Sequence, residues 1–216
     1  MSGPHQGQPV YATGRPLAEA TSAMILVHGR GATAKNILEL ASALPQPEMA
    51  YLAPQAASNT WYPYSFLAPL DQNEPGLSSG LEAIGDLLGQ VEAAGIPAGR
   101  ILLAGFSQGG CLTAEYVARN ARRYGGLLVF SGGLIGPPGT PRSYPGSLAD
   151  TPVFLGCSDV DPHVPLARVE ETADVLTGMG AVVDKQIYPR MGHAINEDEI
   201  ARANRLIQRV VEAGTA

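Results

Sequence analysis

The stretch Ile101-Leu102-Leu103-Ala104-Gly105-Phe106-Ser107-Gln108-Gly109 joins an apolar run to a segment with helical periodicity. The run predicts a buried strand and the periodicity predicts a helix, so Ser107 lies on a sharp turn between them. Such a turn needs flanking glycines, because it brings backbone segments too close together for a β-carbon. The serine hydroxyl then projects from the end of a sheet, and the N–H of Gln108 lies at a helix N-terminus. The pattern predicts a nucleophile elbow.

An elbow serine acts with a carboxylate and a histidine that follow it in the chain, each after a later strand. Asp159 and Asp161 follow the strand expected over residues 152–156, and His193 follows the one expected over residues 181–188. Both separations leave room for strand–helix units, so the three side chains can converge at one sheet edge. We expect the serine to be the nucleophile, Asp161 the orienting acid and His193 the general base.

The other three histidines are poorer candidates for the base. His5 lies in a Gly/Pro-rich arm, His28 precedes the serine, and His163 follows the candidate acid by only two residues. His193 remains, on a loop between a strand and a helix, where a general base is expected.

Two aspartates compete for the role of the acid. Asp161 precedes a proline-stiffened turn, which suits a fixed carboxylate, whereas Asp159 could tie down the loop by accepting backbone N–H groups. We favour Asp161. The alternation of Cys157, Asp159, Asp161 and His163 could also be read as a metal cluster, but no second group of ligands accompanies it. No metal is expected.

The second donor of an oxyanion hole is expected from an earlier loop. An apolar strand over residues 23–28 leads into Gly29-Arg30-Gly31, and these glycines can aim the N–H of Arg30 at the serine, alongside that of Gln108. The same loop also fits the dinucleotide fingerprint G-x-G-x-x-A. That reading needs an acidic residue after the second strand, and the strand expected over residues 50–53 ends without one.

Four stretches together resemble the phospholipase/carboxylesterase family: His28-Gly29-Arg30-Gly31, Gly105–Gly110, Asp161-x-x-Val164-Pro165 and Gly192-His193. That family includes bacterial carboxylesterases and acyl-protein thioesterases on the α/β-hydrolase fold. The resemblance spans about residues 22 to 210 and implies Ser107, Asp161 and His193 as the triad, with Arg30 and Gln108 as backbone oxyanion donors. The thioesterase-like members usually carry an apolar residue at the position of Arg30. A cation there favours a smaller or anionic ester over a long lipid-like acyl group.

The length and the hydrophobic fraction suit one α/β domain over residues 1–216, since the chain has 216 residues and is 45% hydrophobic. Five helical patterns alternate with the strands, near residues 33–43, 78–94, 108–121, 164–178 and 196–213. We expect a compact α/β-hydrolase fold, with a mostly parallel central sheet and helices on both faces. Residues 10–13 are at most a marginal edge strand, and about residues 1–9 are expected to form a flexible arm.

Charge and composition exclude several classes of partner. The net charge is −6 and the 14 basic residues are scattered, so the sequence provides no basic patch for binding nucleic acid. No run approaches the roughly 18 apolar residues that span a membrane, and residues 1–8 lack the pattern of an export signal. Cys111 and Cys157 are expected to be buried free thiols of a cytoplasmic protein. Cys111 is a poor second nucleophile, because the elbow exposes one side chain only.

An irregular segment, Asn59 to Gly76, is rich in large side chains: Trp61, Tyr62, Tyr64, Phe66, Leu67 and Leu70. Its place after the second expected strand suits a flap at the sheet edge where loops build sites. We expect Trp61, Tyr64 and Phe66 to bind substrate. The alternative is that these aromatics only anchor a long loop.

The sequence therefore predicts a serine carboxylesterase that hydrolyses small to medium carboxylic esters through an acyl-enzyme, with no metal or organic cofactor. The expected partner is a small-molecule ester, and a homodimer is left open. A lysophospholipase or acyl-protein thioesterase is the alternative within the same chemistry. A non-catalytic binding module on this fold would lack a member of the triad, and all three positions are filled.

Overall fold

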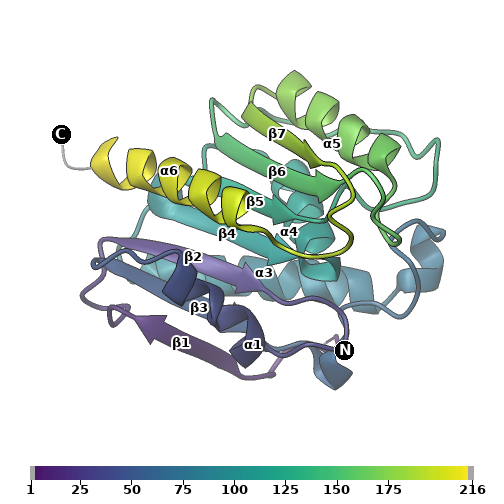
Figure 1. Ribbon diagram of the computed structural model, residues 1–216. Coiled ribbons are helices and arrows are strands. Elements are labelled where there is room, and N and C mark those ends of the chain that lie inside the picture. Colours follow the sequence, from purple (N-terminus) through teal and green to yellow (C-terminus); the bar gives the residue numbers. More distant parts are fainter. Residues whose placement is uncertain (1–2, 214–216) are drawn as a thin grey trace.

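The computed structural model describes residues 3–213, and within them seven strands form one sheet (Figure 1). The strand order is β1-β3-β2-β4-β5-β6-β7. The strands are β1 (Val10–Gly14), β2 (Ser22–Val27), β3 (Met49–Pro54), β4 (Ile101–Phe106), β5 (Gly126–Phe130), β6 (Pro152–Ser158) and β7 (Val182–Tyr188). The edge strand β1 pairs antiparallel with β3, and every other pair of neighbours is parallel. The sheet is the mostly parallel one that the sequence predicts.

Helices cover both faces of this sheet (Figure 1). They are α1 (Ala34–Leu38), α2 (Leu40–Ala43), α3 (Gly76–Ala93), α4 (Gln108–Arg119), α5 (Leu166–Gly178) and α6 (Glu197–Ala213), with short 3-10 helices at Ala57–Asn59, Leu70–Asn73 and Ala98–Arg100. The first two lie on one face with α6, and α3, α4 and α5 lie on the other. The helix expected over residues 33–43 is thus two short helices, of which the first begins with a capping box between Thr33 and Asn36.

The two faces of the sheet bury two separate cores. In β2, Ala23, Ile25 and Val27 face α3 and α4, whereas Met24 and Leu26 face α1 and α6. Successive side chains of a strand point to opposite faces, so a strand covered on both sides must be apolar throughout. This is why the buried strands read as uninterrupted apolar runs in the sequence.

The strand order places a crevice at the carboxyl ends of β2 and β4. From β2 the chain moves outward to β3, and it then crosses to β4 on the other side of β2. The loops after β2 and β4 therefore leave the sheet in opposite directions, and open α/β sheets bind ligands at such a point. Arg30 follows β2 and Ser107 follows β4, so the crevice lies between these two residues.

The N-terminal arm is more firmly packed than the sequence suggests. In its described part, residues 3–9, His5 is 5% exposed and its backbone N–H donates to Ser79 Oγ at 2.9 Å. The His5 ring accepts from the Ala57 N–H through Nδ1 (3.1 Å), and its Nε2 donates to the Trp61 carbonyl (2.8 Å). The expectation of a flexible arm missed these contacts, because they come from residues more than 50 positions away.

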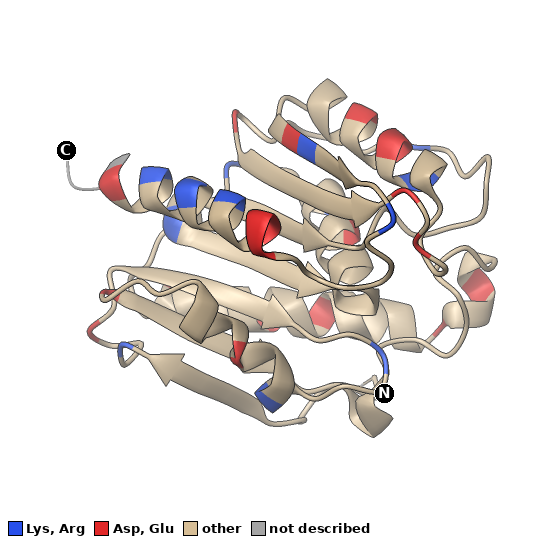
Figure 2. Cartoon of the chain, in the orientation of Figure 1, with Lys and Arg blue, Asp and Glu red and all other residues tan. Residues whose placement is uncertain are grey.

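Charged residues of both signs are spread over helices, loops and β7, and α6 carries both (Figure 2). Among residues 3–213, none of the helices combines the length and the apolar composition needed to cross a membrane.

Candidate active site

Ser107 occupies the strained turn that the sequence predicts, between β4 and α4. Its backbone has φ 57° and ψ −120°, and its N–H donates to the carbonyl of Phe130 on β5 at 2.9 Å. A β-carbon on Gly109 would lie 2.0 Å from the carbonyl oxygen of Val27, and one on Gly105 would lie 2.4 Å from the backbone of Gly109. The flanking glycines are therefore required by the close approach of β2, β4 and α4.

Three side chains that the sequence singled out meet at the carboxyl edge of the sheet. His193 Nε2 lies 2.8 Å from Ser107 Oγ, and His193 Nδ1 lies 2.7 Å from Asp161 Oδ2. An ionised carboxylate only accepts hydrogen bonds, so Nδ1 carries the ring hydrogen and Nε2 is left to accept from the serine hydroxyl. This geometry can pass a proton from Ser107 to His193.

Asp161 is held by the backbone as well as by His193. Its Oδ1 accepts from the N–H groups of His163 (2.8 Å) and Val164 (3.0 Å), and its side chain is fully covered. Burial alone would raise the pKa of this carboxyl, but the hydrogen bonds from His193 and from the two backbone N–H groups outweigh it and lower the pKa. The carboxylate therefore stays ionised beside the imidazole.

The competing Asp159 does what the alternative reading assigned to it. Its Oδ1 accepts from the N–H of Arg190 at 2.7 Å, which ties the loop after β6 to the loop after β7. Ser158 Oγ reinforces the same connection by accepting from the Gly192 N–H at 3.1 Å. Asp159 thus positions the loop that bears His193, whereas the two ring nitrogens of His193 bond Asp161 and Ser107.

Two rings pack against His193. Phe106 and His163 each have their ring centroid 4.8 Å from that of the imidazole, and both line the same cavity as Ser107. The sequence makes His163 a poor candidate for the base, because it follows Asp161 by only two residues. The turn in which Asp161 accepts the N–H of His163 returns this ring to the site, and an Asp two residues before a histidine was the available signal.

The backbone N–H groups expected to bind an oxyanion have no hydrogen-bond acceptor among residues 3–213. Within residues 3–213, neither Arg30 nor Gln108 donates a backbone hydrogen bond, and both residues line the cavity beside Ser107. Gln108 is the first residue of α4, where an N–H has no partner inside the helix. Both groups are available to a developing negative charge.

The cavity at this edge has a volume of about 630 Å³. Its wall combines backbone turns, aromatic rings and the side chains of the expected nucleophile and base: Gly29, Arg30, Ala32, Tyr62, Pro63, Tyr64, Ser65, Phe66, Phe106, Ser107, Gln108, Cys111, His163, Val164 and His193. Tyr64 and Phe66 are among the wall residues, as expected for a flap. Trp61 is not, because its indole is fully buried behind the wall, where Nε1 donates to the carbonyl of His28 at 2.9 Å. Trp61 is therefore an anchor of the loop.

A family model described as phospholipase/carboxylesterase matches residues 10–211. The chain belongs to the phospholipase/carboxylesterase family. The crystal structure of a phospholipase/carboxylesterase from Dyadobacter fermentans has a TM-score of 0.90 to this chain at 46% identity, and the match covers 94% of this chain and 97% of that one. Both findings confirm the family and the α/β-hydrolase fold expected from the sequence.

Two more distant proteins also match nearly the whole chain. Acyl-protein thioesterase 1 of Debaryomyces hansenii is 28% identical over 94% of this chain and 96% of its own length. The Bacillus cereus carboxylesterase has a TM-score of 0.74 at 18% identity and covers 95% of each chain, a likeness that shows the shared fold.

The side chains of Arg30 and Gln108, the two expected oxyanion residues, also form hydrogen bonds with the flap over residues 59–76. Arg30 donates from Nη1 to Thr60 Oγ1 (3.1 Å) and the Pro63 carbonyl (2.7 Å), and from Nη2 to the Tyr64 carbonyl (2.6 Å). Gln108 accepts from the Trp61 N–H at 2.9 Å and donates to the Tyr62 carbonyl at 2.8 Å. The two expected oxyanion residues are therefore both tied to the flap by side-chain hydrogen bonds.

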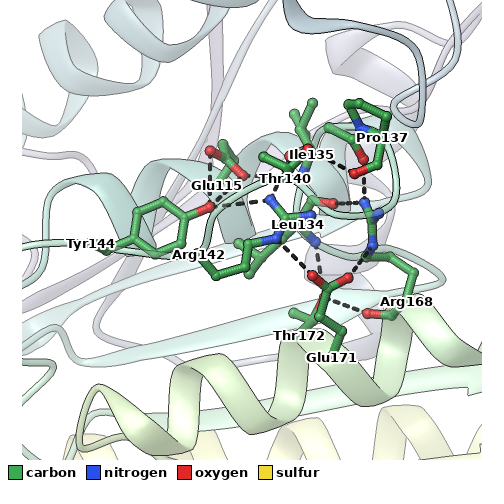
Figure 3. A network of polar contacts seen from close by, with 11 residues as sticks. Glu115, Leu134, Ile135, Pro137, Thr140, Arg142, Tyr144, Arg168, Glu171 and Thr172 are labelled. Carbon is green, nitrogen blue, oxygen red and sulfur yellow. Dashed lines mark hydrogen bonds and ion pairs between the residues drawn. The ribbon is translucent and has the colours of Figure 1, made fainter.

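A network of polar contacts joins the loop after β5 to α4 and α5 (Figure 3). Arg168 donates from Nη1 to the carbonyls of Leu134 (2.6 Å) and Gly136 (2.7 Å), and its Nε pairs with Glu171 at 2.7 Å. The Gly136 N–H in turn donates to the Phe66 carbonyl at 2.7 Å. The loop over residues 132–145, itself held by Arg168, thus helps to fix the position of Phe66.

Cys111 lines the same cavity, yet it is a poor nucleophile. Burial raises the pKa of its thiol to about 12, so the thiol stays protonated near neutral pH. Of Ser107 and Cys111, it is Ser107, the nucleophile expected from the elbow, whose side chain hydrogen-bonds His193.

Proposed function

We propose that this protein is a serine carboxylesterase that hydrolyses small to medium carboxylic esters through an acyl-enzyme intermediate. The observation that carries the proposal is the continuous hydrogen-bonded relay from Ser107 through His193 to Asp161, beside the cavity that Ser107 and His193 line. Membership of the phospholipase/carboxylesterase family supports hydrolysis of an ester bond. A binding module with this fold would have no need of the complete relay.

In the first half-reaction, Ser107 Oγ attacks the ester carbonyl carbon while its proton passes to His193 Nε2. The carbonyl oxygen becomes an oxyanion, for which the N–H groups of Arg30 and Gln108 are the proposed donors. Asp161 stabilises the imidazolium and keeps the ring in the required tautomer. The imidazolium then gives its proton to the departing alkoxide, which leaves as the alcohol.

In the second half-reaction, water attacks the acyl-enzyme and gives its proton to His193. Collapse of the intermediate returns the proton to Ser107 Oγ and releases the carboxylic acid. The residues of the relay supply every proton transfer, so the proposed reaction calls for no metal or organic cofactor. Two buried free cysteines suit a reducing compartment, which supports the cytoplasm as the place of action.

The second candidate is an acyl-protein thioesterase. The relative from Debaryomyces hansenii bears that name and matches nearly the whole chain. Thioesters pass through the same acyl-enzyme, so the two functions differ in the substrate that the cavity accepts. A panel of 4-nitrophenyl esters from acetyl to palmitoyl distinguishes them, because the proposed function predicts the highest kcat/KM on the short and medium chains.

The nucleophile is tested with a fluorophosphonate probe, which labels activated serines. We expect the wild-type protein to be labelled at Ser107, and Ser107→Ala to lose labelling and ester hydrolysis together. Cys111→Ala is the matched control, because it changes a second cavity residue and should keep both. Labelling that persists in Ser107→Ala would contradict the proposal.

A further inference from the structure

The wall of the cavity carries basic side chains and no acidic ones. Besides His193, it carries the guanidinium of Arg30 and the imidazole of His163, and no Asp or Glu is among its residues. Asp161 is close by, but its carboxylate is fully covered and engaged by His193. The protein as a whole has a net charge of −6, so this positive wall runs against the overall sign of the molecule. A local charge of this kind selects among ligands by their charge.

The Arg30 guanidinium is fixed in place by neutral partners. Its three hydrogen bonds go to a hydroxyl and two carbonyls, and it lies 5.9 Å from the centroid of the Tyr62 ring. By contrast, Arg119 and Arg122 pair with Glu115 and Glu92. Within the described part of the chain, no carboxylate lies within 4.0 Å of the Arg30 guanidinium, so its charge is left for a ligand.

The Arg30 guanidinium also has N–H donors that its three hydrogen bonds do not use. Arginine has five N–H donors, and the bonds to Thr60, Pro63 and Tyr64 use both hydrogens of Nη1 and one of Nη2. The N–H of Nε and one N–H of Nη2 remain. A guanidinium with donors to spare, already held in one conformation, binds a carboxylate at a low cost in side-chain entropy.

From this geometry we infer that the preferred substrates are esters that carry a free carboxylate, and that Arg30 is the residue that recognises it. The inference rests on the proposed esterase function and names its substrate class. Because Arg30 and Ser107 line the same cavity, the carboxylate is tested on both the acyl part and the alcohol part of the ester. His163, whose ring contacts His193, is a further basic side chain on this wall.

The test uses two pairs of esters of similar size and reactivity. Monomethyl adipate against methyl hexanoate places the carboxylate on the acyl side, and 4-acetoxybenzoate against phenyl acetate places it on the alcohol side. For each pair, the ratio of kcat/KM on the anionic ester to kcat/KM on the neutral ester is measured at low ionic strength. Loosening of the flap affects both esters of a pair, so the ratio isolates the recognition of charge.

In Arg30→Leu we expect this ratio to fall roughly tenfold in the pair whose carboxylate reaches the guanidinium, a value moderated by solvent at an exposed side chain. Arg30→Lys keeps the charge and should retain most of the ratio while both rates fall. Raising the salt concentration should lower the wild-type ratio and leave that of Arg30→Leu unchanged. Arg15→Leu is the control: it removes the same charge beside the amino end of β3, the opposite edge of the sheet.

A ratio in Arg30→Leu within about twofold of that in Arg15→Leu, in both pairs, overturns the inference. The neutral esters test the proposed function separately. If wild type hydrolyses them and Ser107→Ala does not, the esterase proposal stands whatever the ratio shows. If wild type hydrolyses none of the four esters, the proposed function fails and takes the substrate class with it.

Discussion

The substitution Asp161→Asn tests the role of the carboxylate in the relay from Ser107 through His193 to Asp161. The two backbone N–H groups of His163 and Val164 that point at Oδ1 need an acceptor, so the amide oxygen of the asparagine belongs there. Its NH₂ group then faces His193 and donates to Nδ1. The imidazole is forced to carry its hydrogen on Nε2, the atom that must accept the serine proton.

The size of the effect follows from the cost of turning the amide around. A flipped amide would point its NH₂ group at two N–H donors and leave both unsatisfied, at about 1–3 kcal/mol each. Since about 1.4 kcal/mol is a factor of ten, the productive orientation becomes roughly 30-fold to 10⁴-fold rarer than the unproductive one. The lost carboxylate charge adds to this. We expect kcat to fall on the order of 10⁴-fold, the effect of the equivalent change in a serine protease.

The assay is nitrophenolate release from 4-nitrophenyl butyrate, with circular dichroism to show that the fold is retained. Asp159→Asn is the matched control, because its carboxylate accepts one backbone N–H from Arg190, which an amide oxygen can still accept. We expect it to lose less than about tenfold. Equal losses in the two variants, or a larger loss in Asp159→Asn, would refute the assignment of Asp161.

Two further predictions concern the framework of the site. Gly109→Ala places a β-carbon 2.0 Å from the Val27 carbonyl oxygen, so we expect a loss of about 3 kcal/mol or more in the free energy of unfolding, measured by urea denaturation. Gly89→Ala lies in α3, where the added β-carbon would meet no atom within 4 Å outside the backbone of its own helix, so it should be neutral or stabilising by up to about 1 kcal/mol. Equal losses of stability in Gly109→Ala and Gly89→Ala would contradict this account. Burial of Glu199 raises its pKa from 4.5 to about 7, so the folded state binds a proton more tightly than the unfolded state, and stability falls as the pH rises between those values. Glu199→Gln should therefore raise Tm relative to wild type above about pH 7 and leave it unchanged near pH 4, and a shift of the same size at both would argue against this linkage.

The sequence by itself determined the sheet, the elbow and the order of the chemical groups. These are local signals. The apolar runs of β2 and β4 follow from burial on both faces, and the glycines around Ser107 follow from the space that a tight turn leaves. The positions of Asp161 and His193 could be predicted because parallel strands end at one edge, whichever loops connect them.

The tertiary structure decided which of several suitable side chains faces the site. Asp159 and Asp161 are alike in sequence context, and their roles diverge because the N–H of Arg190, 31 residues away, captures the first while the second accepts from its own turn and from His193. The packing of His28 and His5 around Trp61 turned a candidate substrate contact into a loop anchor. The position of the Arg30 side chain likewise depends on carbonyls more than 30 positions further on. Such choices rest on contacts between distant segments, and these exist only once the chain has folded.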